Sequence, residues 1–96
     1  MIKHMIVWKL KDDAVDNIQY EIKHALEGLV GVIDGLLAMK IHIFPLEGST
    51  GDIAMESIFQ SKEALDFYQR HELHQSIANT LVRPNVDIRL SFDFEL

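Results

Sequence analysis

The two ends of the chain carry the pattern that most restricts the fold, because residue character there repeats with a period of two. Between Ile2 and Leu10, one side of an extended chain takes Ile2, His4, Ile6, Trp8 and Leu10. The other side takes Lys3, Met5, Val7 and Lys9. The segment VDIRLSFDFEL, from Val86 onward, alternates in the same way. This period, with branched and aromatic residues, predicts a β-strand at each end of the fold.

Two segments between these strands have helical spacing instead. In the first, apolar residues recur at steps of three and four: Val15, Ile18, Ile22, Leu26, Leu29 and Ile33. Asp12 or Asp13 is placed to cap its start, and Asp34–Gly35 to end it. The second helical region is predicted to begin after Ser61 and to continue through SIANTLV to Pro84.

Two more strands complete the predicted order. One runs from about Leu36 to Phe44 and stops at Pro45, and the other covers about Asp52 to Gln60. The order strand, helix, strand, strand, helix, strand predicts a single domain over residues 1–96. We expect a ferredoxin-like α+β fold, βαββαβ, with a four-stranded antiparallel sheet and both helices on one face.

That arrangement leaves the other face of the sheet uncovered. Met5 and Val7 lie opposite the Ile6–Trp8 side, and the second strand carries apolar residues on both sides. Strands that are buried on both faces lose simple alternation. The chain has no third layer to supply, so we expect a homodimer in which two sheets face each other and form a dimeric α+β barrel.

Composition removes several classes of function. The chain has no cysteine, which excludes disulfides, thiolate zinc sites and cysteine nucleophiles. Its net charge of −6, without a run of Lys or Arg, argues against a nucleic-acid partner. The N-terminal apolar run is broken by charges and is too short for a signal peptide or a membrane span. We therefore expect a cytoplasmic protein that does not bind membranes.

The segment FYQRHELHQ places Tyr68, His71 and His74 at steps of three. On one continuous helix these side chains would span about 120° and share a broad face. His4 could approach that face from the first strand. A neutral imidazole can remove a proton beside a carbonyl, and a tyrosine hydroxyl can donate to the enolate oxygen, without a cofactor. HELH lacks the four-residue histidine step of zinc proteases, so no metal site is predicted.

Each of these residues also has a purely structural interpretation. Tyr68 fits a core aromatic, His74 a solvated histidine and His4 a satisfied polar group of the core. Trp8 fits either the core beneath the helices or the wall of a ligand pocket. The separated arginines, Arg70, Arg83 and Arg89, are first interpreted as surface residues or inter-strand partners.

The segments IKHMIVWKLKDDA and SKEALDFYQRHELH resemble the stress-responsive α/β-barrel (Dabb) family, and the resemblance covers essentially the whole chain. The resemblance implies a dimeric α+β barrel. The family includes a polyketide cyclase, whose site implies His74 as general base and Tyr68 as the hydroxyl that holds substrate. It also implies pocket positions for His4 and His71, and it places Ile53 where the cyclase has another histidine.

Three hypotheses about function follow. The first is a cofactor-independent enzyme or binding protein for a small apolar keto compound, with catalytic His74, Tyr68 and His4 and with Trp8, His71 and Ile53 around the ligand. The second is a non-catalytic assembly protein of the stress response. The third is a cofactor-free monooxygenase, which rests on fold analogy alone.

Overall fold

The four strands form one antiparallel sheet in the order β2-β3-β1-β4, in a computed structural model that describes residues 1–96. Their bounds are β1 Ile2–Leu10, β2 Leu36–His42, β3 Ile53–Phe59 and β4 Val86–Glu95. The predicted ends of the two middle strands each lie within two residues of the observed ends. The predicted ferredoxin-like α+β fold is therefore confirmed.

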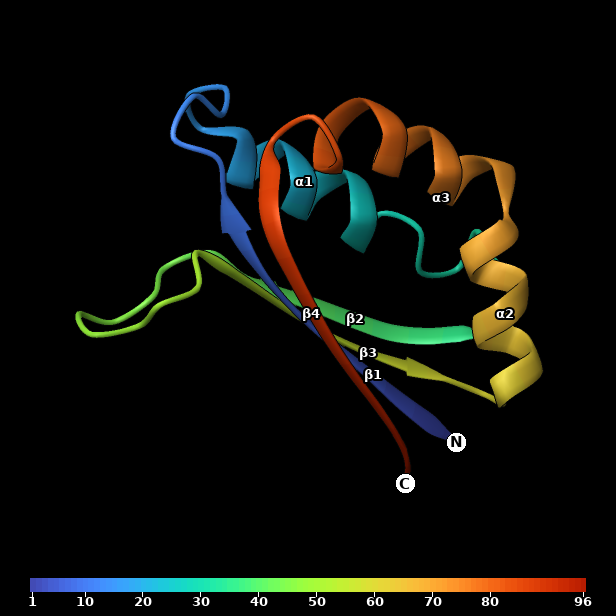
Figure 1. Cartoon of the computed structure of the whole chain (residues 1–96). Coiled ribbons are helices and arrows are strands. Elements are labelled where there is room, and N and C mark those ends of the chain that lie inside the picture. The colour runs from blue at the N-terminus through green and yellow to red at the C-terminus, as the bar shows by residue number, and fades with distance from the viewer.

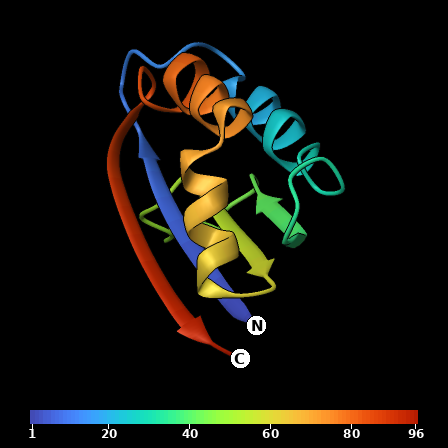
Figure 2. The ribbon, with the colours of Figure 1, turned by 90° about the vertical axis from the view of Figure 1, so that its right-hand side faces the viewer.

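All helices lie on one face of the sheet (Figures 1 and 2). They are α1 Ile18–Glu27, α2 Lys62–Arg70, α3 Glu72–Ile77 and the π-helical turn η1 Ala78–Val82. The apolar core fills the space between these helices and the sheet, and its fully buried members include Ile22, Phe59 and Tyr68. None of the helices has both the length and the apolar character that crossing a bilayer requires.

The first helix is shorter than the apolar spacing predicts. Asn17 has a left-handed backbone with φ 63°, so the regular helix starts only at Ile18. Upstream of it, the Val15 N–H donates to Asn85 Oδ1 at 2.9 Å, which ties this segment to the loop before β4. The helix ends at Glu27, yet Leu29 and Ile33 remain buried because the following turns keep them against the core.

The second helical region is helical as predicted, but it is not one continuous helix. Ser61 does cap its start, because Ser61 Oγ accepts a hydrogen bond from the Ala64 N–H at 3.1 Å. At His71, however, the backbone becomes extended, with φ −64° and ψ 137°, and separates α2 from α3. His71 Nδ1 accepts a hydrogen bond from the Leu73 N–H at 3.1 Å, so this side chain caps the new helix.

The register of β4 on β1 decides which face of the sheet each residue of β4 occupies. Phe92 pairs with Met5 and Leu90 with Val7, so the apolar row of β4 lies on the face without helices. Leu90 and Phe92 are 66% and 69% exposed there. The structure therefore confirms the predicted uncovered apolar face, which we call the open face: Met5, Val7, Ile88, Leu90, Phe92 and Phe94.

The polar row of β4 consequently faces the helices. Asp93 pairs with His4, and Arg89 pairs with Trp8. Both partners on β1 are buried beneath the helices. A charged row is thus directed toward the layer that would ordinarily be filled with apolar side chains, which provides polar groups for a site.

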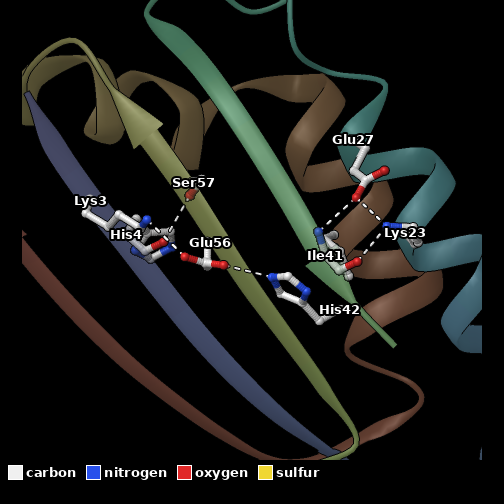
Figure 3. A network of polar contacts seen from close by, with 8 residues as sticks. All are labelled: Lys3, His4, Lys23, Glu27, Ile41, His42, Glu56 and Ser57. Atoms are coloured by element: carbon white, nitrogen blue, oxygen red, sulfur yellow. Dashed lines mark hydrogen bonds and ion pairs between the residues drawn. The ribbon is translucent and has the colours of Figure 1, made fainter. Parts of the chain in front are cut away.

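Two side chains of α1 complete the hydrogen bonding of the edge strand β2 (Figure 3). The Glu27 carboxylate accepts from the Ile41 N–H at 2.8 Å, and Lys23 Nζ donates to the Ile41 carbonyl at 2.6 Å. Burial raises the pKa of Glu27, but the hydrogen bonds from Lys23 and Ile41 outweigh it and hold that pKa below its ordinary value. The outer edge of β2 is therefore blocked at Ile41 against another strand.

A second polar cluster lies on the open face and away from the helices (Figure 3). Glu56 accepts from Lys3 Nζ at 2.9 Å and from His42 Nε2 at 2.7 Å. These two hydrogen bonds lower the pKa of Glu56. His42 and Glu56 therefore form no part of the histidine and tyrosine constellation on the helix side.

Candidate functional site

A cavity of about 220 Å³ lies between the helix-facing side of the sheet and the segment that runs from α2 to η1. Its apolar lining comprises Ile6, Trp8, Leu26, Met55, Ala78 and Val82. Its polar lining comprises His4, Tyr68, Gln69, His74, Gln75, Arg83 and Arg89. An apolar cavity with a few convergent polar groups is the usual form of a small-molecule site.

Tyr68 lines the cavity because α2 buries the side of the helix that carries Leu65 and Tyr68. The tyrosine is 1% exposed, and its ring lies 5.0 Å from the Phe59 ring and 4.3 Å from the His74 ring, centroid to centroid. Burial raises the pKa of Tyr68, so its hydroxyl stays protonated at neutral pH. That buried hydroxyl has no hydrogen-bond partner within the chain.

His74 lies in α3, directly after the break at His71. Its Nδ1 lies 3.2 Å from the Gln69 carbonyl oxygen, and because a carbonyl only accepts, Nδ1 carries the proton. Burial lowers the pKa of His74, and the Gln69 carbonyl opposes this shift. The nearby side chains of Arg83, His4 and Arg89 lower the pKa further by charge repulsion. The ring is therefore neutral at pH 7, with a free lone pair on Nε2.

His4 reaches the cavity from the floor of the sheet. The side chain is 2% exposed, and its Nδ1 is paired with the carboxylate of Asp93 on the neighbouring strand. Ser57 Oγ donates to the His4 carbonyl at 3.2 Å, which holds the backbone at this position (Figure 3). The carboxylate occupies Nδ1, so Nε2 is the nitrogen left for a ligand. This is how a base or an orienting histidine is commonly held.

Comparison with known proteins identifies the family and the fold of this chain. The sequence matches the family described as the Stress Responsive A/B Barrel Domain, Dabb, over residues 2–96. The chain belongs to the Dabb family. No curated protein sequence matches this Dabb domain.

Three solved structures show how widely the fold of this Dabb domain is shared. A protein of Arabidopsis thaliana is 25% identical, with a TM-score of 0.84 over 100% of this chain and 95% of that one. A dimeric ferredoxin-like protein of unknown function from Thermobifida fusca is 20% identical, with a TM-score of 0.86 over 99% and 90%. A hydroxynitrile lyase from Passiflora edulis is 12% identical, with a TM-score of 0.81 over 97% and 90%.

The structure brings four of the six predicted site residues of this Dabb domain to one cavity: His4, Trp8, Tyr68 and His74. His71 does not line it, because the backbone break turns its side chain to cap α3 and to contact the ring of Phe67. Tyr68, His71 and His74 therefore do not share one helical face, as a continuous helix would have required. Ile53 is buried beside Trp8 on β3 and borders a different hollow, near the β2–β3 connection.

Sequence reasoning missed the charged members of the site. Arg83 and Arg89 line the cavity, and Asp93 holds His4. The alternation of the last strand contained the necessary signal, since every residue on one face of it is polar and all but Ser91 are charged. That signal can be interpreted only when the pairing of β4 with β1 is known, because this pairing places the polar face of β4 beneath the helices. The structure brings no group of three His, Asp or Glu side chains into metal-binding proximity.

Proposed function

We propose that this Dabb domain binds a small ketone in the cavity and catalyses proton transfer at the carbon beside its carbonyl group. His74 Nε2 is the general base, the Tyr68 hydroxyl donates to the carbonyl oxygen, and His4 orients the substrate. Trp8 forms part of the apolar wall against which the substrate lies. No cofactor takes part in this step.

The proposed step balances within the site. The C–H bond beside the carbonyl breaks, and its proton moves to His74 Nε2. The electron pair of that bond forms a carbon–carbon double bond, and the carbonyl π electrons move to oxygen. The buried Tyr68 hydroxyl stabilises the developing enolate by a hydrogen bond. Return of the proton, or attack of the enolate on a second carbonyl group, then completes an isomerisation or a cyclisation.

One observation carries the proposal, namely the relation between the Tyr68 hydroxyl and the His74 ring. The hydroxyl is buried and unpartnered, and the two rings lie 4.3 Å apart, centroid to centroid. A buried hydroxyl without a partner is unfavourable for folding, so its retention in the cavity wall fits a role in ligand binding. His74 beside it is neutral and offers a lone pair, which is the protonation state that a base requires.

The test is exchange of ketone protons with solvent. Phenylacetone is incubated with the protein in D₂O at pH 7, and loss of its methylene proton signal is followed by NMR. We expect the wild-type protein to accelerate exchange above the buffer rate, and His74→Gln to remove most of that acceleration. The matched control is His24→Gln, because His24 is an exposed histidine on α1 outside the cavity. Equal exchange by the wild-type protein and by His74→Gln would contradict the assignment of His74 as base.

We also propose that two copies pair through their open faces. Monomers rarely leave a continuous apolar patch of this kind exposed, and the Thermobifida fusca relative is described as dimeric. Sedimentation velocity should give a dimer for the wild-type protein and a monomer for Phe92→Asp. Phe67→Asp is the control, since Phe67 is 48% exposed on α2, on the helix side. A wild-type monomer at micromolar concentration would refute the pairing.

A non-catalytic assembly protein is the second candidate, and the open face is the observation that favours it. Such a protein would dimerise in the same way but would neither bind phenylacetone nor accelerate its proton exchange. The exchange experiment and a binding titration therefore separate the two candidates, whatever the oligomeric state.

A further inference from the structure

Two guanidinium groups at the cavity have no carboxylate partner. Arg83 follows η1 and Arg89 lies on β4, and both line the cavity. The chain carries 15 acidic residues and has a net charge of −6, yet neither arginine has an acidic oxygen within 4.0 Å. Arg83 contacts only the neutral amide oxygens of Gln75 and Asn79. Among the Lys and Arg side chains, only Lys3 and Lys23 have such a partner, so what distinguishes Arg83 and Arg89 is their place in the cavity lining.

The remaining lining does not neutralise these charges. It contains neither Asp nor Glu, and the nearby Asp93 is paired with His4. Both guanidinium groups line the same cavity as the proposed base, His74, and their charges lower the pKa of that histidine. The two guanidinium charges make the site electropositive, and it suits an anion.

Several other residues of the lining are buried and are apolar or carry neutral hydrogen-bond donors. Ile6, Met55 and Val82 provide an apolar wall. Two buried donors there, Trp8 Nε1 and the Tyr68 hydroxyl, have no partner within the chain. A cavity of about 150 Å³ in another protein holds benzene, so about 220 Å³ accommodates a single ring with a short polar chain. A neutral oxygen acceptor on such a molecule would satisfy a donor that the fold leaves unpaired.

From these observations we infer that the ligand of this cavity is a small carboxylate, which also bears a carbonyl or phenolic oxygen on an apolar body. Arg83 and Arg89 bind the carboxylate group, because a guanidinium fork matches the two oxygens of a carboxylate. The apolar body lies against the cavity wall, and the second oxygen accepts from Tyr68 or Trp8. This inference rests on the proposed function and narrows its substrate class from ketones to keto acids; a phenolic acid would bind the same site without undergoing the proton transfer.

The experiment uses two probes that differ only at the proposed anchor. Phenylpyruvate and phenylacetone share a benzyl ketone skeleton, and a carboxylate in the first replaces a methyl group in the second. Binding is measured by isothermal titration calorimetry at low ionic strength. We expect phenylpyruvate to bind about tenfold tighter or more, in line with charge-assisted hydrogen bonds. Added salt should reduce this preference.

Substitutions assign the effect to the two arginines. Arg83→Gln and Arg89→Gln should each reduce the preference for phenylpyruvate, and the double variant should abolish it while phenylacetone binding persists. Arg70→Gln is the matched control, because Arg70 is an exposed arginine on α2 outside the lining. Thermal denaturation of each variant checks the fold, and exposed positions should tolerate glutamine.

The outcomes distinguish a failure of this inference from a failure of the proposed function. Equal binding of the two probes overturns the carboxylate assignment and leaves the ketone site standing. Binding of neither probe overturns both. Tight phenylpyruvate binding that survives in the double variant also overturns the assignment, as does full displacement of phenylpyruvate by equimolar inorganic phosphate, which would reveal a general anion site.

Discussion

Removal of the Tyr68 hydroxyl should make the free protein more stable and impair ligand binding. The hydroxyl is buried and has no partner, while the ring packs against Phe59 and His74. Tyr68→Phe keeps that packing and deletes only the unsatisfied polar group. An unpaired buried polar group costs about 1–3 kcal/mol, so we expect the free energy of unfolding to rise by about 1 kcal/mol or more. For a domain of this size, each kcal/mol of added stability raises Tm by roughly 4–8 °C.

The assay is thermal and urea denaturation at one fixed protomer concentration, because dimer formation would make Tm depend on concentration. Tyr20→Phe is the control, since Tyr20 is 50% exposed and its hydroxyl lies outside the cavity. We expect the free energy of unfolding of that variant to lie within about 0.5 kcal/mol of the wild-type value.

In the presence of ligand, the wild-type protein should become more stable than Tyr68→Phe. At a hundredfold excess over Kd, a ligand stabilises the wild-type protein by about 2.7 kcal/mol. Tyr68→Phe should show much less of this gain, because the donor for the carbonyl oxygen is missing. A free Tyr68→Phe protein that is less stable than wild type would show that the hydroxyl has a partner in the fold, and would refute the reasoning.

The other predictions concern pH, backbone conformation and the edge of the sheet. The folded-state pKa of His74 lies below its ordinary value of 6.5, so the unfolded chain binds the proton first as the pH falls. The free energy of unfolding should therefore decrease as the pH drops through about 6.5. Denaturation of His74→Gln should not show this decrease. Gly35→Ala should lower the free energy of unfolding by about 2 kcal/mol or more, because φ is +87° and a Cβ would lie 2.6 Å from Ala64 Cβ. The control is Gly48→Ala, where φ is +95° but a Cβ meets no atom within 4 Å, so only the smaller backbone effect should appear. Equal losses for the two variants in chemical denaturation would contradict the steric part of this prediction. Glu27→Ala should lower the free energy of unfolding by about 1–2 kcal/mol, because the Ile41 N–H loses its acceptor. An unchanged midpoint of urea denaturation would contradict this prediction.

The sequence predicts the sheet better than the site, for a physical reason. Alternation is a local property, so β1 is predicted with its observed bounds, Ile2–Leu10. The face that each residue of β4 occupies depends on its pairing with β1, which the alternation of one strand does not contain. Arg89 is exposed, as the sequence suggests, but its place in the cavity lining could not be predicted.

The break at His71 is another feature that local spacing does not reveal. Steps of three between Tyr68, His71 and His74 suit a continuous helix, and no Pro or Gly marks a boundary between them. The structure instead ends α2 at Arg70 and uses His71 to cap α3. The interruption separates His71 from the cavity while His74 keeps its contact with Tyr68.

The central claim is that the cavity between β1 and the α2–α3 segment holds the ligand, and Trp8 provides the most direct measurement. The chain has a single tryptophan, whose indole N–H is buried in the cavity lining without a partner, so it gives one indole signal in a ¹H–¹⁵N NMR spectrum. Titration with phenylpyruvate or phenylacetone should shift that signal saturably, together with the ring signals of His74. Saturable binding that leaves the Trp8 indole signal and the His74 ring signals unmoved would contradict the account.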